Sequence, residues 1–522
     1  MITSNVMKNE KYWEQFSVLP ADLDYLVNYL VDCESPKTIE ELTEQLIHHR
    51  HEQQVGLMEK TLSQGRIYRP GESFEEKETI VFPHMGNLLG EVVAIRPGRN
   101  PEHEPFSVLE VQMEDGSERQ FAADLRGDHP LDKASYMPAA DASPQELYEQ
   151  YGGEIGVALR QTLEQHGQFV SVAGHQWFVS DLLMEVSVGQ LNIAEALLDM
   201  NDGGPLPTHA FLDEMDLPEE IPERLQLFSL EYALLHDGRF DEVGPAGRAM
   251  WYLRRMEPKA VLEIPSHLRY MPIPYNRSLI DDTMLSLERQ MDDEWSETTF
   301  EREIGDEVTV VLSYPHWRSG TLPLTKRLSK LFPTARVTDR IRFTFVDADT
   351  EEEFPGWVVR SNRYVYGLED WYEQYDVGVG TYVDLKRREE PGLFEVGVRQ
   401  FRSRRGEWLR TVSAEDGRLS FEVTRVPIAC EFDELVAIAV LEPEAVDALA
   451  EQLKRVSLES LIDQMFQELA VLSLQRAVHA MTLYSVINLV RRVPPAPLMA
   501  VLTTAPQYVS LGDNYWAYRG DN

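Results

Sequence analysis

The spacing of apolar residues changes several times along the chain, and the first change separates helices from strands. Between residues 21 and 62, apolar side chains recur every three to four positions, which is the period of an amphipathic helix. Two short apolar runs follow, at residues 66–68 and 79–82, and they favour a hairpin. We therefore expect residues 1–77 to form an N-terminal helical unit that leads into this hairpin.

Two later blocks alternate apolar and polar residues with the period of a β-strand. Residues 78–126 contain such runs divided by Pro and Gly turns, which predicts a small barrel of about five strands. Residues 300–430 contain a series of short strand candidates separated by turn sequences such as Glu415-Asp416-Gly417. Short strands at this spacing indicate a barrel or a sandwich.

Helical periodicity dominates residues 143–258 and 450–522, and hairpins with a shared pattern interrupt it. The pattern consists of an aromatic residue, a strand of small or β-branched residues, a glycine turn and then a tryptophan. It occurs three times, at residues 169–179, 239–253 and 507–518. Recurrence of this kind predicts a repeated supersecondary unit.

The charge of the chain limits what it can bind. Its 49 Lys and Arg residues stand against 88 Asp and Glu residues, which gives a formal net charge of -39. A surface of this charge repels phosphate, so contact with nucleic acid requires a local basic face, and the acidic remainder favours basic protein partners.

Residues 316–410 are the candidate for such a face, because they hold 17 Lys and Arg residues against 15 Asp and Glu residues. Basic and aromatic side chains that suit phosphate contact with base stacking occur there at Trp317, Arg318, Lys386, Arg387, Arg388, Arg402, Arg404 and Arg405. The alternative interpretation is a solvated strand face that pairs with the chain's own carboxylates.

The tryptophan-terminated hairpins resemble the wing of winged-helix domains, in which a strand pair packs against three helices. The middle and C-terminal units are similar to the helix-turn-helix domains found beside the bacterial RNA polymerase delta subunit and in chromatin-associated proteins. This resemblance implies a recognition helix in the major groove of DNA. The candidate helix runs from residue 482 to 492, with the polar set Thr482, Tyr484, Ser485, Asn488, Arg491 and Arg492. Many winged helices bind only proteins, however, and arginines also suit a helix C-terminus.

The central β block resembles the pseudobarrel DNA-binding domain of plant transcription factors and of some restriction-enzyme effector domains. The segments that carry this resemblance are Ile341–Asp347, Gly356–Val359, Tyr364–Leu368, Trp371–Tyr372 and Gly378–Val383. The family usually has Gly-Asp where this chain has Gly380-Thr381. The resemblance implies that the β block binds double-stranded DNA.

Motifs of catalytic or metal chemistry are absent or faint. The sequence contains no GxxxxGK[ST], HExxH, GxSxG or CxxC motif, so we expect no cofactor and no metal. The carboxylates of Asp281, Asp282, Glu288, Asp292, Asp293 and Glu294 are expected to form the solvated face of an acidic helix. A remote alternative is a metal-dependent nuclease, since Pro101-Glu102 followed by Glu110-Val111-Gln112 weakly matches such a site, with Gln where Lys belongs.

These patterns predict an α+β protein with several winged-helix units, a small N-terminal β-barrel and a central pseudobarrel-like domain. No signal-like or membrane-spanning apolar run occurs, so a cytoplasmic location without membrane contact is expected. The favoured function is non-enzymatic DNA binding in transcription or its regulation, with no small-molecule substrate. The alternative is an acidic interaction scaffold, or a nucleic-acid mimic, that binds a basic protein or the transcription machinery.

Overall fold

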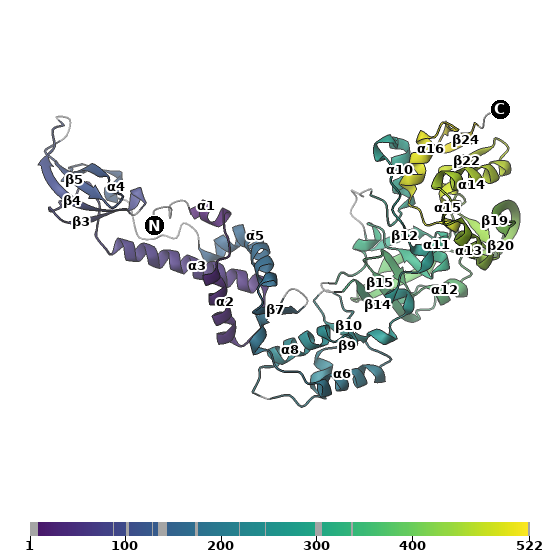
Figure 1. Ribbon diagram of the computed structural model, residues 1–522, viewed down its shortest axis with the longest axis horizontal. Coiled ribbons are helices and arrows are strands. Elements are labelled where there is room, and N and C mark those ends of the chain that lie inside the picture. The colour runs from purple at the N-terminus through teal and green to yellow at the C-terminus, as the bar shows by residue number, and fades with distance from the viewer. Residues whose placement is uncertain are drawn as a thin grey trace. The chain divides into compact units, whose positions relative to one another are not determined.

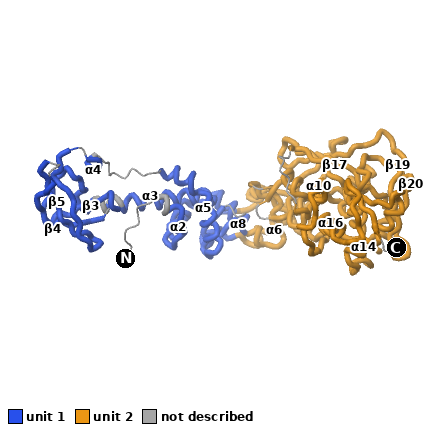
Figure 2. Tube along the Cα trace, turned by 90° about the horizontal axis from the view of Figure 1, so that it is seen from above, with its two compact units in different colours: residues 1–185, 217–232 blue, residues 186–216, 233–522 orange. Residues whose placement is uncertain are grey.

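The computed structural model describes most of the chain as two compact units (Figure 2). The described residues are 9–519, without 87, 101–103, 128, 134–142, 173–175, 219, 246, 298–304 and 336–337. The first unit comprises Met1–Glu185 and Leu217–Tyr232, and the second comprises Val186–Asp216 and Ala233–Asn522. The expected α+β class is confirmed, since both units combine helices with sheets.

The first unit contains a helical part with a small sheet (Figure 1). Its helices are α1 (Asn9–Glu14), α2 (Pro20–Cys33), α3 (Ile39–Leu62), α4 (Pro130–Lys133) and α5 (Pro144–Gln165), followed by most of α8 (Glu223–His236). Strands β1 (Lys37–Thr38), β8 (Gln176–Val179) and β7 (Phe169–Val172) pair in that order. α5 begins at a capping box, in which Ser143 and Glu146 satisfy each other's backbone N–H groups.

A five-stranded sheet is inserted between α3 and α5. Its strands, in spatial order, are β2 (Arg66–Ile67), β3 (Thr79–Phe82), β4 (Leu88–Pro97), β5 (Ser107–Met113) and β6 (Glu118–Ala123). Ile80, Val92 and Leu109 are fully buried in its core. β2 and β3 pair in parallel, so the expected N-terminal hairpin of residues 66–68 and 79–82 does not form.

The second unit begins with a similar set of small elements. These are α6 (Val188–Met200), β9 (Leu206–Pro207), α7 (His209–Leu212), the end of α8, β10 (Phe240–Glu242), β11 (Met250–Leu253) and α9 (Lys259–Leu262). β11 lies between β10 and β9 in their sheet. Trp251 of β11 is fully buried, and its indole N–H donates a hydrogen bond to Thr208 Oγ1 at 2.9 Å.

A nearly closed, barrel-like sheet of seven strands forms the centre of the second unit. In spatial order the strands are β12 (Glu307–Val311), β17 (Tyr382–Arg387), β18 (Leu393–Val398), β14 (Arg340–Asp347), β15 (Glu353–Val359), β16 (Tyr364–Tyr366) and β13 (Thr321–Pro323). β14 and β18 pair in parallel, and the other neighbours are antiparallel. The short helices α11 (Tyr314–Arg318) and α12 (Glu369–Gln374) connect strands of this sheet.

A separate three-stranded sheet follows the barrel-like sheet. β19 (Gln400–Glu415) pairs with β20 (Arg418–Cys430) on one side and with β21 (Ile438–Val440) on the other. The single barrel expected over residues 300–430 is therefore two sheets. The physical reason is that β19 satisfies its backbone groups against β20 on one edge and β21 on the other, rather than against the seven strands.

The C-terminal elements pack on a large apolar core. They are α13 (Pro443–Leu453), α14 (Leu458–Leu472), β22 (Ala477–His479), α15 (Ala480–Val490), α16 (Pro495–Thr504), β23 (Tyr508–Gly512) and β24 (Tyr515–Tyr518). α10 (Asp282–Met291) also contributes to this core through Met284 and Leu287. β24 lies between β22 and β23.

One order of elements thus occurs three times along the chain. Each copy has a helix, a short strand, two further helices and a hairpin, and in each small sheet the last strand lies in the middle. In the first copy the five-stranded sheet separates the second helix from the third. The sequence pattern assigns the hairpin at residues 169–179 to the middle region, but its third strand is β1, so it completes the N-terminal copy.

Within the described residues, no helix has the length and apolar character that crossing a membrane would require.

Candidate functional site

The β19–β20 hairpin carries three exposed arginines of the expected basic region. Its turn is Asp416-Gly417, and both residues have positive φ (49° and 75°), as a tight two-residue hairpin turn requires. From the pair Glu415 and Arg418 the strands run together to a bulge near Arg405. Residues 402–406, at the end of β19 away from the turn, are all exposed.

Three predicted arginines lie on this exposed segment. Arg402, Arg404 and Arg405 are all exposed. The Arg405 guanidinium lies over the Phe401 ring, 4.6 Å from its centroid, and Arg404 forms an ion pair with Asp376 at 3.1 Å. Among the described residues, Arg402 and Arg405 have no carboxylate partner. Two of these three positive charges are therefore uncompensated by any carboxylate that the structure describes.

An aromatic side chain accompanies these arginines. Trp408 is 69% exposed, although a tryptophan normally buries most of its surface. Arg425 lies directly opposite Trp408 across the strand pair, and its Nε donates a hydrogen bond to the Gly406 carbonyl oxygen at 3.1 Å. Cross-strand partners share a face, so the hairpin presents a flat ring beside a guanidinium. We name Phe401, Arg402, Arg404, Arg405, Trp408 and Arg425 the arginine hairpin face.

Arg425 lies outside the region predicted to be basic, which ends at residue 410. The turn sequence could have predicted the position of Arg425. Glu415-Asp416-Gly417 fixes the hairpin register, and counting back from it places Arg425 opposite Trp408.

In the predicted basic group at residues 386–388, two arginines make contacts that stabilise the barrel-like sheet. Arg387 donates hydrogen bonds to the backbone carbonyl oxygens of Lys330 and Leu331. Arg388 forms ion pairs with Glu351 at 2.7 Å and with Glu395 at 3.0 Å. Lys386 is exposed and has no ion pair with a described residue.

Trp317 and Arg318, the two predicted contact residues on α11, form contacts with other parts of the same unit. The Trp317 indole N–H donates to the Val377 carbonyl oxygen at 2.8 Å. Arg318 forms ion pairs with Asp447 at 2.9 Å and with Glu444 at 3.2 Å. Neither side chain is therefore available for the expected stacking and phosphate contact unless it gives up these partners.

The expected recognition helix is a core helix, and this corrects the expectation that it faces DNA. Every residue of α15 is buried, including Thr482, Tyr484, Ser485 and Asn488. Their polar groups are satisfied inside the protein, because the Thr482 and Ser485 hydroxyls donate to the carbonyl oxygens of Leu435 and Val436. Arg491 caps another helix by donating to the carbonyl oxygens of Leu453 and Lys454.

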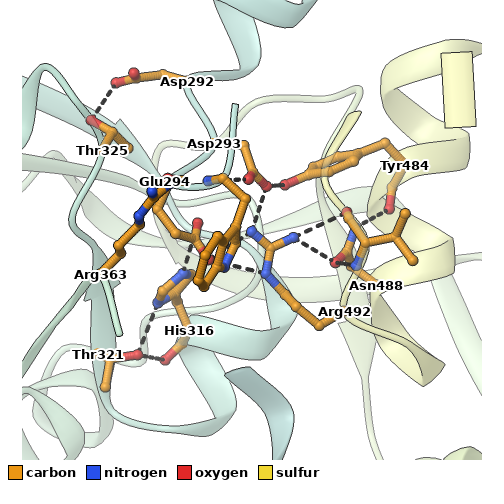
Figure 3. Close-up of polar contacts among 12 residues, drawn as sticks. Asp292, Asp293, Glu294, His316, Thr321, Thr325, Arg363, Tyr484, Asn488 and Arg492 are labelled. Atoms are coloured by element: carbon orange, nitrogen blue, oxygen red, sulfur yellow. Dashed lines mark hydrogen bonds and ion pairs between the residues drawn. The ribbon is translucent and has the colours of Figure 1, made fainter. Parts of the chain in front are cut away.

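Arg492 is the centre of a buried ionic network (Figure 3). Its Nη2 lies 2.6 Å from Asp293 Oδ2 and 2.6 Å from Glu294 Oε1. Its Nη1 donates to Asn488 Oδ1 at 3.1 Å and to the Val493 carbonyl oxygen at 3.0 Å. The Tyr484 hydroxyl donates to Asp293 at 2.6 Å.

His316 extends the network to the barrel-like sheet. Its Nε2 is 3.4 Å from Glu294 Oε2, and its Nδ1 is 2.9 Å from the hydroxyl of Thr321 on β13. Burial would raise the pKa of Glu294, but Arg492 and His316 outweigh it and lower the pKa to about 2. The network joins the C-terminal helices to the seven strands, which is a structural role.

The expectation of solvated acidic side chains is right for Asp281 and Asp282, which are exposed, and wrong for Glu288, Asp293 and Glu294, which are buried. Asp293 and Glu294 are only 5% and 4% exposed, and Glu288 is fully buried. Glu288 is paired with Arg277 at 2.8 Å. Each of these carboxylates has an arginine partner, so burial does not leave an isolated charge. Hydropathy alone could not reveal this pairing, since Arg492 is about 200 residues away in sequence.

The described residues contain no candidate metal centre, because no group of three or more of their His, Cys, Asp and Glu side chains is placed to hold a metal ion. Of the nuclease-like segments, Pro101 and Glu102 lie outside the described residues, and Glu110 lies on β5 with an ion pair to Arg96.

The two cysteines differ in access, which predicts their reactivity. Cys430 is buried, and burial raises the pKa of its thiol to about 11, whereas Cys33 is half-buried. Thiol reagents attack the thiolate. We expect Ellman's reagent to modify one thiol per native chain quickly and the second only after denaturation. Replacement of Cys33 by Ser should abolish the fast phase, and a fast phase that survives this change would contradict the assignment.

The comparisons with known proteins provide no family: no family model, no curated protein and no solved structure matches the chain.

Proposed function

We propose that the chain is a non-enzymatic DNA-binding protein that contacts DNA through the arginine hairpin face. The observation that carries this proposal is the exposure of Trp408 beside Arg425, on a hairpin whose Arg402, Arg405 and Arg425 have no carboxylate partner among the described residues. A two-stranded ribbon fits the major groove, and arginines bind phosphates and guanine edges there. An exposed indole adds a stacking surface for an unpaired base.

We further propose that the three recurring units are winged helices and that the barrel-like sheet is a pseudobarrel. The order of helix, strand, two helices and hairpin, with the last strand central, supports the first assignment. The seven strands with two short helices support the second. Both folds are common in DNA-binding regulators, which is the reason to place the proposed function in transcription or its regulation.

The winged helices are proposed as scaffold rather than as DNA readers. α16, the third helix of the C-terminal copy, is almost entirely buried and apolar. α5, the third helix of the N-terminal copy, exposes glutamates such as Glu149 and Glu154 and carries one arginine, Arg160. Helices of this kind offer phosphate few cations and several carboxylates.

The test is fluorescence anisotropy with a labelled mixed-sequence duplex over a salt series. Replacement of Arg402, Arg404 and Arg405 by Ala removes three cations of the arginine hairpin face. For each phosphate that the variant no longer neutralises, the slope of log K against log salt should fall by about 0.9. We expect binding that weakens with salt in the wild type, and a smaller slope with much weaker binding in the variant.

A matched control removes the same charge elsewhere in the second unit. Arg269, Arg289 and Arg455 are also exposed, and their joint replacement by Ala should leave the slope and the affinity nearly unchanged. Equal reductions in both triple variants would mean that only net charge matters. Absence of binding at low salt would reject the DNA proposal.

A second candidate function is an acidic scaffold that binds a basic protein. The observation in its favour is the excess of carboxylates, which gives the chain a formal net charge of -39. This function predicts that the chain binds cationic polypeptides and does not bind DNA at any salt concentration.

A further inference from the structure

A cavity of about 360 Å³ lies in the second unit, against β15, β16 and α12. Two kinds of side chain dominate its wall. The aromatic ones are Phe354, Trp357, Tyr366 and Trp371, and the acidic ones are Asp347, Glu352, Glu369 and Asp370. The cavity is remote in sequence from the arginine hairpin face and has the opposite charge.

Asp347 contributes a buried negative charge to the wall of the cavity. Asp347 is only 2% exposed, and its carboxylate accepts hydrogen bonds from the Trp371 indole N–H at 2.6 Å and the Tyr375 hydroxyl at 2.9 Å. It also accepts from the backbone N–H groups of Asp349 and Thr350, both at 2.8 Å. A carboxylate with four donors stays ionised, so the cavity keeps this charge.

The other carboxylates of the wall lack counter-charges. Glu352, Glu369 and Asp370 are exposed, and none of them forms an ion pair with any residue that the structure describes. By contrast, Glu351 in the β14–β15 connection and Glu395 on β18 are paired with Arg388. The cavity is therefore a site of uncompensated negative charge.

The aromatic rings add a second, independent preference. The faces of aromatic rings attract ammonium and guanidinium groups. Trp357 is 2% exposed, packs edge-to-face on Tyr252, and, within the described part of the chain, its indole N–H has no hydrogen-bond acceptor. The indole N–H is therefore free to donate a hydrogen bond to a ligand carbonyl oxygen.

We propose that this cavity binds a lysine or arginine side chain of a basic polypeptide partner. The carboxylates and rings recognise the cationic end, and a peptide carbonyl oxygen accepts the Trp357 N–H. A bare metal ion fits the wall poorly, because aromatic rings form much of it and no metal-ligand group occurs among the described residues. The negative chain attracts any cationic peptide, and the cavity supplies a local site for it.

The experiment measures binding of a fluorescein-labelled peptide of alternating lysine and glycine to the full chain by anisotropy. Glu369→Gln with Asp370→Asn removes two carboxylates of the cavity. The control, Glu389→Gln with Glu390→Gln, removes two exposed carboxylates from the β17–β18 connection. We expect the cavity variant to bind about ten-fold more weakly, and the control to bind within about two-fold of the wild type.

A second pair of variants separates recognition by rings from recognition by charge. Tyr366→Leu should weaken peptide binding, whereas Tyr366→Phe keeps the ring and should retain it. Equal binding by the two double variants, or no binding at low salt, would overturn the proposal. If Tyr366→Leu fails to fold, the exposed carboxylate variants decide alone. The cavity variants should leave DNA binding unchanged, so failure here is distinguishable from failure of the DNA proposal.

Discussion

Replacement of Arg492 by Ala is expected to destabilise the second unit by about 3–5 kcal/mol. The arginine is 6% exposed and lies 2.6 Å from carboxylate oxygens of both Asp293 and Glu294. Its removal leaves two buried carboxylates without their main cation, and His316 alone cannot compensate both. Removal of one partner from a buried ion pair costs far more than the pair itself contributes.

Urea unfolding followed by tryptophan fluorescence and circular dichroism measures this effect. The exposed Arg455 provides the control, since Arg455→Ala should change the free energy of unfolding by less than about 0.5 kcal/mol. Addition of Asp293→Asn and Glu294→Gln to Arg492→Ala should restore part of the stability, because neutral side chains are less costly to bury. Similar unfolding midpoints for Arg492→Ala and Arg455→Ala would contradict the structural role of the network.

The buried network of Arg492, Asp293 and Glu294 could not be predicted from the sequence, for a physical reason. Asp293 and Arg492 look solvated when each is judged by its neighbours in sequence, and only the tertiary fold brings them together. The helix itself carried a usable signal. The sequence AMTLYSVINLV of α15 is apolar on all sides, which indicates a buried helix rather than one with a polar face for DNA.

The repeats were visible in the sequence, but their boundaries were not. The three hairpins end in Trp177, Trp251 and Trp516, all buried, which explains why the pattern recurs. The strands that complete the first two sheets, β1 and β9, have two residues each. Strands of that length show no period, so the link between the N-terminal helices and the hairpin at residues 169–179 could not be predicted.

Replacement of Asp347 by Ala is expected to destabilise the barrel-like sheet by more than about 3 kcal/mol, since each buried donor left unsatisfied costs about 1–3 kcal/mol. The change removes the acceptor for the indole N–H of Trp371 and the hydroxyl of Tyr375. It also removes the acceptor for two backbone N–H groups in the turn after β14. The exposed Glu373 on α12 is the control, because Glu373→Gln should be nearly neutral in the same unfolding measurement.

Asp347→Asn separates the charge of this side chain from its shape and predicts a pH dependence. Burial raises the pKa of Asp347, but the hydrogen bonds from Thr350, Tyr375, Trp371 and Asp349 outweigh it, so the pKa lies below the ordinary 3.8. A depressed pKa means that the folded chain binds fewer protons than the unfolded chain near that pH, so its contribution is complete above the ordinary pKa and is lost as the pH falls. The stability gap between the wild type and Asp347→Asn should therefore be widest near neutral pH and should narrow below about pH 4. A gap of constant width down to the acid transition would show that the carboxylate charge contributes nothing, and that the gap comes only from the acceptor that Asn lacks.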